Sequence, residues 1–239
     1  MANRNTLSMR IVTVSLLALG LLAGALADDF DRKIAAFPLL QNKQVQTELG
    51  ISAGQLKQMN VFADDFNKKA KAYQAEVLKK AGNDPKKVKP DSARESAMLS
   101  DLKTKVINLL NPVQLKRLRE LSLQAVGVTA LGDDTVAQRV GINATQKTQI
   151  RGFVKAGLDA ANKILMEVER TSRAGIVQPK SDAEAKKAND VYQGRRQAEM
   201  KKVSPQLQKI RQGTIDKVMA VLTPAQKKTW KDLLGKLFG

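Results

Sequence analysis

Adjacent carboxylate pairs are the residues of this 239-residue chain whose type and spacing come closest to a metal-binding or acid–base pattern. They are Asp28–Asp29, Asp64–Asp65 and Asp133–Asp134. Neighbouring residues on a helix point about 100° apart, so the two carboxylates of one pair cannot hold a single ion together. We expect Asp133–Asp134 to begin the helix that leads to Val140. The sequence therefore predicts no metal site and no cofactor.

The chain contains neither His nor Cys. Histidine is the commonest general base and transition-metal ligand, and cysteine supplies thiolate nucleophiles and disulfides, so these chemistries are excluded. No Ser-x-x-Lys, Gly-x-Ser-x-Gly or glycine-rich phosphate loop is present either. We expect a protein that binds rather than an enzyme, with no catalytic residue.

Positive charge is the most conspicuous chemical property, with a formal net charge of +18 and a pI near 10.1. Residues 144–239 carry +11 of it, whereas residues 28–143 carry +5. Arg195, Lys202 and Lys209 recur every seven residues, which aligns them on one helical face. This basic stripe is either a solvated face or a surface that attracts acidic segments of client chains through salt-sensitive forces.

The elements that position these side chains follow a helical period. Apolar residues fall three or four apart from Met59 to Leu78 and again from Leu99 to Leu110, and strand-like alternation is absent. Helix breaks are predicted at residues 81–85, 89–90, 127–134 and 174–180, where Gly, Pro, Asn and Asp gather. The sequence predicts an all-α fold of antiparallel helical hairpins, with Trp230 packing the last helix against its neighbours.

Four segments place a capping side chain three residues before a glutamine, the pattern of a capping box. The pairs are Ser52 and Gln55, Asn111 and Gln114, Asn143 and Gln146, and Thr223 and Gln226. Pro112 and Pro224 occupy the first helical position, where no amide hydrogen is missed. We interpret these residues as helix starts, each contributing about 1 kcal/mol.

The order of the boxes predicts an internal duplication. Residues 49–59 match residues 140–150, at an offset of 91 positions. Residues 106–121 match residues 218–233, at an offset of 112 positions. The second copy therefore has 21 more residues between its boxes. Ser92 and Ser181 are predicted to cap the returning helix of each copy. From Asp182 that helix could run about forty residues to Leu222, with a kink at Ser204–Pro205. The predicted modules are residues 28–132 and 133–239, the second with an extended hairpin.

Two of the boxes carry a resemblance to a known family. Residues 222–226 read LTPAQ and residues 110–114 read LNPVQ, and both resemble the LTxxQ motif of the periplasmic family that includes Spy and CpxP. Asn111 stands where the motif has Thr. The chain also lacks the His and Cys ligands of the family's metal-responsive members.

The resemblance implies an ATP-independent chaperone of the holdase type, or a stress-response protein of the envelope. Such a protein holds unfolded or partner chains on a basic, partly apolar helical surface, and family members form curved homodimers. An alternative from the charge is a basic structural envelope protein that binds an anionic polymer. Sparse aromatic residues, 4% of the chain, disfavour stacking on single-stranded nucleic acid.

Residues 1–27 have the pattern of a signal peptide, with Arg4 and Arg10 before an apolar run and Ala25-Leu26-Ala27 before Asp28. The protein is therefore expected to be periplasmic or secreted; the alternative is an uncleaved membrane anchor. Two linked modules can pair within one molecule, because linkage gives a high effective concentration. We expect a monomer with an internal pseudo-two-fold axis, with a homodimer as the alternative.

Overall fold

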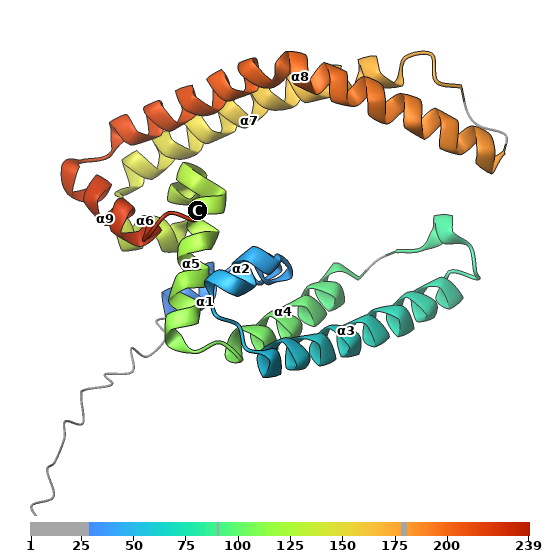
Figure 1. The fold of residues 1–239 in the computed structure, drawn as a ribbon, viewed down its shortest axis with the longest axis horizontal. Helices are drawn as coiled ribbons and strands as arrows, with labels where there is room; N and C mark the ends of the chain where they lie inside the picture. The colour runs from blue at the N-terminus through green and yellow to red at the C-terminus, as the bar shows by residue number, and fades with distance from the viewer. Residues whose placement is uncertain (1–28, 90, 178–180) are drawn as a thin grey trace, which may run out of the picture.

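The computed structural model describes residues 29–89, 91–177 and 181–239, and the regular elements within these ranges are all helical (Figure 1). The predicted all-α class is confirmed. The predicted signal peptide, residues 1–27, lies outside the described residues. Among the helices that the structure describes, none combines the length and apolar character needed to cross a membrane.

The first half of the chain begins with short helices and continues into a long hairpin. Its elements are α1 (Asp29–Ile34), the 3₁₀ helix η1 (Phe37–Gln41), α2 (Lys43–Glu48), α3 (Ala53–Lys80), the 3₁₀ helix η2 (Pro85–Lys87), α4 (Ser92–Asn108) and α5 (Pro112–Val126). The second half repeats much of this order with the 3₁₀ helix η3 (Gly127–Gly132), α6 (Asp134–Val140), α7 (Ala144–Arg173), α8 (Asp182–Val221) and α9 (Pro224–Leu234).

Two helical hairpins project from a central bundle toward the same side of the molecule (Figure 1). We call α3–α4 the first arm and α7–α8 the second arm. Their outgoing helices are similar in length, 28 and 30 residues, but the returning helices have 17 and 40 residues. The extra residues of the second half therefore lie in α8, which continues as one helix through Pro205.

The predicted cap of α4 is wrong by one position. Asp91, not Ser92, is the N-cap, and its Oδ1 accepts hydrogen bonds from the amides of Ala93 and Arg94, both at 3.1 Å. An aspartate is a better acceptor for these amides because its charge also complements the positive end of the helix. Asp133 caps α6 in the same way, through the amides of Thr135 and Val136, and the helix reaches Val140.

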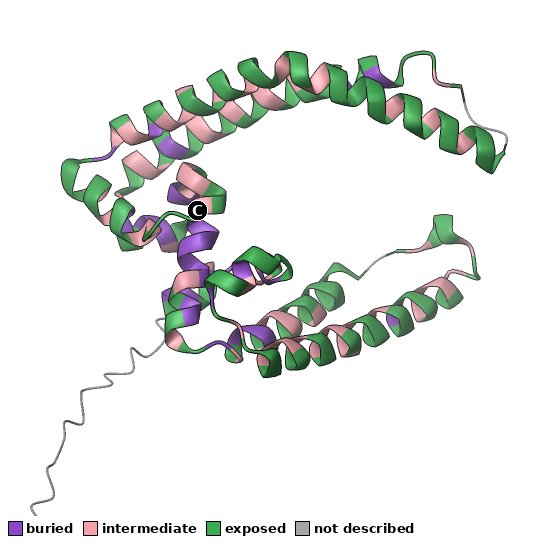
Figure 2. Cartoon of the chain, viewed as in Figure 1, coloured by how far each residue is buried: buried purple, intermediate pink, exposed green. Residues whose placement is uncertain are grey.

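Burial is concentrated in the central bundle, while the arms are mostly exposed (Figure 2). One apolar core joins η1, α2, the end of α4 and α5, with Leu115 and Leu118 fully buried. The other joins α6, η3, the base of the second arm and Trp230 of α9. Phe30 of α1 belongs to this second core, so the start of the chain packs against its second half.

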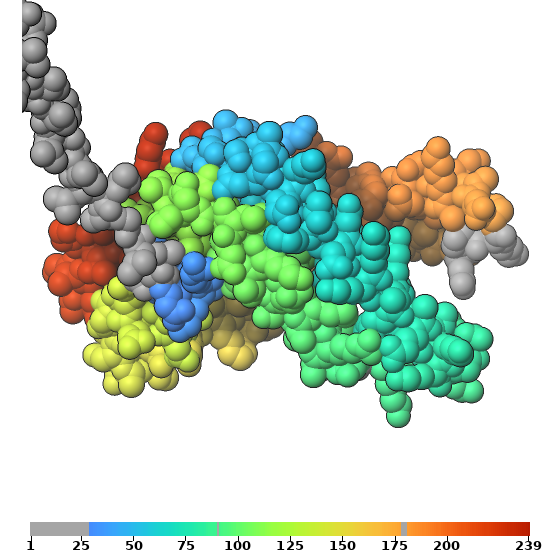
Figure 3. Space-filling view, turned by 90° about the horizontal axis from the view of Figure 1, so that it is seen from below, coloured from blue at the N-terminus to red at the C-terminus, as the bar shows by residue number. Residues whose placement is uncertain are grey.

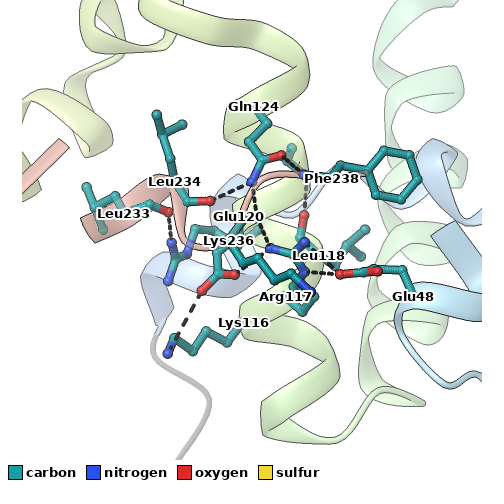
Figure 4. Close-up of polar contacts among 12 residues, drawn as sticks. Glu48, Lys116, Arg117, Leu118, Glu120, Gln124, Leu233, Leu234, Lys236 and Phe238 are labelled. Atoms are coloured by element: carbon teal, nitrogen blue, oxygen red, sulfur yellow. Dashed lines mark hydrogen bonds and ion pairs between the residues drawn. The ribbon is translucent and has the colours of Figure 1, made fainter. Parts of the chain in front are cut away.

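Polar contacts from α5 also tie the two halves together (Figure 4). Arg119, 5% exposed, donates to Asp31 of α1 at 2.9 Å and to the carbonyl oxygen of Leu233 at the end of α9. Arg117 pairs with Glu48 of α2 and donates to the carbonyl oxygen of Lys236 at 2.6 Å. Two neighbouring arginines thus connect the entry helices of the first half with the end of the second.

The last residues fold back along α5. Gly235 has a φ of +63°, and a Cβ atom there would lie 2.3 Å from the Glu120 carboxylate. Gln124 donates to the carbonyl oxygens of Leu234 and Lys236, both at 2.7 Å, and accepts from the amide of Phe238 at 2.9 Å. Glycine is needed at this turn because a side chain would suffer both backbone strain and collision.

Candidate functional site

The four predicted boxes all have complete capping-box geometry. In each box the oxygen of the cap side chain accepts a hydrogen bond from the backbone amide of the glutamine. The side-chain Oε1 of that glutamine in turn accepts from the backbone amide of the cap residue. These bonds satisfy two amides that a helix start leaves without partners. The motif residues therefore cap the backbone at the starts of these helices.

The glutamine side chains also join the boxes in pairs. Gln146 donates from Nε2 to Gln226 Oε1 at 2.9 Å and to the carbonyl oxygen of Val221 at 2.9 Å. Gln226 donates back to Gln146 Oε1 at 3.0 Å and to the carbonyl oxygen of Gly141 at 2.6 Å. We call this reciprocal arrangement the glutamine clasp. It fixes the start of α9 against the start of α7.

The same clasp recurs in the first half at equivalent positions. Gln55 donates to the carbonyl oxygen of Leu109 at 2.7 Å and to Gln114 Oε1 at 2.8 Å. Gln114 donates to the carbonyl oxygen of Gly50 and to Gln55 Oε1, both at 3.2 Å. The capping-box pattern in the sequence gave the local bonds but missed these pairings. The available signal was that one glutamine box comes just before the first helix of each hairpin and another comes just after its second helix.

An apolar groove opens at the base of the second arm, where η3 meets α7 and α8. Its volume is about 200 Å³. Its walls are mostly aliphatic, with Leu158 and Val126 55% and 53% exposed. The aliphatic lining comes from Val126, Val128, Val154, Leu158, Leu207, Ile210 and Ile215. Side chains of this size left in water offer an apolar contact surface to another chain.

Close packing of α7 on α8 forms the floor of this groove. A Cβ atom on Gly157 would lie 2.3 Å from the Thr214 Oγ1, so only glycine permits this approach of the two helices. Arg211 lines the groove beside the aliphatic residues. The site therefore offers aliphatic contact and a cation at one place.

Comparison with known proteins gives a match to the second half of the chain. Residues 129–234 match the family model described as LTXXQ motif family protein, a little under half of the chain. We call residues 129–234, which are similar to this family, the LTXXQ segment. No curated protein and no solved structure matches the chain. The predicted resemblance is thus confirmed for the LTXXQ segment, which contains the second glutamine clasp and most of the groove.

The predicted basic stripe lies elsewhere on the LTXXQ segment. Arg195, Lys202 and Lys209 are exposed, and none of them lines the groove. Arg195 donates to the carbonyl oxygen of Ala174 at 2.6 Å, and Lys202 pairs with Glu199 at 2.6 Å. Lys209 stands two residues from both Leu207 and Arg211, a rotation of about 160° away from them on α8. The cation that lines the groove is Arg211, and a role of the predicted stripe in binding stays a prediction.

Polar pairs hold the outer part of the second arm. Tyr192 of α8 donates to Glu169 of α7 at 2.5 Å, and the Arg173 guanidinium lies over the Tyr192 ring, 4.9 Å from its centroid. The hydrogen bonds from Tyr192 and Arg173 lower the pKa of the Glu169 carboxyl. This pairing fixes the register of the two helices beyond the groove.

The first arm is pinned by charges and has its own apolar cavity. Lys105 of α4 lies 3.8 Å from Asp65 of α3, and Lys69 of α3 lies 4.0 Å from Asp101 of α4. The hydrogen bond from Lys69 lowers the pKa of the Asp65 carboxyl. A cavity of about 600 Å³ farther out is lined by Phe66, Tyr73, Val77, Val88 and Met98, among others. In the described ranges no group of three or more carboxylates could hold a metal ion.

Proposed function

We propose that the protein is an ATP-independent holdase of the cell envelope that keeps unfolded or partner chains on the second arm. The observation that carries this proposal is the exposed aliphatic groove with Arg211 at its edge, in a segment of the LTXXQ family. A client would place aliphatic side chains in the groove, while the positive charge of the second half attracts its acidic residues. Export would follow from cleavage after residue 27.

The groove supports a holding function for two physical reasons. Its exposed aliphatic surface favours burial by about 25 cal/mol per Å², without requiring a particular client sequence. Charge attraction in water is long-ranged but screened, so it increases encounters more than residence time. Such a site binds many unfolded chains weakly and does not use nucleotide.

A variant of the groove tests this proposal in an aggregation-suppression assay. Replacing Leu158 by Ser removes an exposed aliphatic side chain, so it should leave stability almost unchanged and weaken suppression of aggregation severalfold. Met166→Ser is the matched control, because Met166 is 72% exposed on the same helix and does not line the groove.

Equal activity of both variants and the unaltered protein would reject the groove as the client site. Failure of the unaltered protein to suppress aggregation would reject the holdase itself. The polymer alternative has a different signature, because binding to an anionic polymer falls steeply with salt. Client binding with an aliphatic component should survive in part at high salt.

We further propose that residues 28–132 and 133–239 are two copies of one module that pair within the molecule. The two identical clasps support this, as do the burial of Phe30 in the second core and the Arg119–Asp31 pair. Light scattering of the mature protein at several concentrations should give the mass of one chain. A concentration-independent mass near twice that value would instead place the pairing between chains.

A further inference from the structure

The outer end of the first arm is a strongly basic tip. Between Lys79 and Lys89 the chain has five lysines and a single carboxylate, Asp84. The lysines are Lys79, Lys80, Lys86, Lys87 and Lys89, all of them exposed. They occupy the end of α3, η2 and the residues after it. We call this segment the first tip.

The carboxylates nearby neutralise only part of this charge. Glu76 pairs with Lys80 at 2.7 Å and with Arg94 at 3.0 Å, and Asp84 pairs with Lys87 at 3.7 Å. Within the described ranges, no carboxylate lies within 4.0 Å of the ammonium groups of the other three lysines of the tip, Lys79, Lys86 and Lys89. Three cations therefore point into solvent from one short segment.

A polar pocket of about 290 Å³ lies at the base of the first tip. Lys80, Lys87, Lys89 and Arg94 line it, together with Glu76, Asp91 and Tyr73. The Tyr73 side chain, only 7% exposed, accepts a hydrogen bond from the amide of Asp91 at 2.7 Å. An accepting hydroxyl still has its own proton to donate. The pocket thus combines four cations and two carboxylates with a buried hydroxyl donor, and Glu76 neutralises part of the charge of Lys80 and Arg94. The remaining positive charge and the hydroxyl donor suit a phosphate group.

The position of the tip decides which phosphate source fits. The two arms end on the same side of the molecule in both views, with the first tip at one outer end and the end of the second arm near it (Figure 3). At the end of the second arm, Val177 is 79% exposed, and Arg170 and Arg173 pair with Glu167 and Glu169. The unpaired positive charge is therefore at the first tip. A membrane carries many phosphates on one extended surface and can meet the cations inside and outside the pocket together, whereas a small anion can occupy only the pocket.

We propose that the first tip docks on an anionic phospholipid membrane. The pocket, with Lys89 in its lining, receives one lipid phosphate, and Lys79 and Lys86 contact neighbouring headgroups. Basic residues near such a surface gain attraction that fades within a Debye length, so the contact is peripheral, reversible and sensitive to salt. The proposal is independent of the holdase function, because the groove is lined by residues of η3, α7, α8 and the end of α5, and none of the tip residues 79–89 lines it.

Vesicle flotation with the mature protein tests the proposal. The protein should float with vesicles of phosphatidylcholine and phosphatidylglycerol at low salt, but not with phosphatidylcholine alone. The variant K86Q/K87Q/K89Q should lose about tenfold or more of this binding. The matched control is K209Q/K217Q/K227Q, which removes the same charge from exposed lysines near the base of the second arm. The conservative variant K86R/K87R/K89R should keep full binding.

Three outcomes would overturn the proposal. Equal loss in the two glutamine variants would assign the binding to net charge alone. Equal flotation with neutral vesicles would remove the phosphate from the recognition, and displacement by inorganic phosphate at low concentration would reduce the tip to a free-anion site. Aggregation suppression measured on the same samples should stay unchanged in K86Q/K87Q/K89Q and in K86R/K87R/K89R, which separates this test from that of the groove.

Discussion

Replacing Arg119 by methionine should lower the free energy of unfolding by about 3 to 5 kcal/mol, the largest effect that we expect of any single substitution. Asp31 is only 8% exposed, and the change removes the cation that pairs with its carboxylate. It also removes the donor to the carbonyl oxygen of Leu233. Urea unfolding followed by circular dichroism measures the difference.

A second variant separates the pair from the packing of its carbon atoms. Arg119→Met with Asp31→Leu removes both charges, so stability should return close to that of the unaltered protein. If Arg119→Met alone costs less than about 1 kcal/mol, the pair behaves like an exposed one and does not hold the two halves together.

Loss of the glutamine clasp should have the second-largest effect. Gln226→Ala removes a capping acceptor and leaves the Gln146 amide with fewer partners, at an expected cost of about 2 to 3 kcal/mol. The full cycle of Gln146→Ala, Gln226→Ala and the double variant should show a coupling energy of about 1 kcal/mol or more. Denaturant unfolding of the four proteins supplies the cycle.

Gln149→Ala is the matched control, because Gln149 is exposed one turn further along α7. It should change stability by less than about 0.5 kcal/mol. Aggregation suppression by folded Gln226→Ala should stay nearly constant, since the motif glutamine contacts backbone and its partner glutamine. A strong loss of client binding without loss of stability would instead place the motif in the binding site.

Helix existence and helix starts could be predicted because they depend on local sequence. The forty-residue helix expected from Asp182 to Leu222 is α8, Asp182–Val221, and four capping boxes stand where the spacing put them. The short helices α1 and α2 have six residues each and did not show in the pattern. Helices of that length depend on tertiary packing, which a periodicity cannot report.

The groove could not be predicted because its walls come from three separate segments. Val126, Leu158 and Leu207 are unremarkable apolar residues of three helices, and only the packing of η3 on the second arm brings them together. The basic stripe is a second feature whose place relative to the groove could not be predicted from spacing. Heptad spacing placed Arg195, Lys202 and Lys209 on one face of α8, but the face that meets the groove is fixed by Leu207 and Thr214 against α7.

The turn at Gly235 gives α5 a second role besides packing the core. Gly235 turns the chain back onto α5, where Arg117 and Gln124 donate to the carbonyl oxygens of Leu234 and Lys236. The residues that follow α9 are therefore held by the same helix that contacts α1 and α2 through Arg119 and Arg117. Any local opening of α5 would release the entry helices and the tail together.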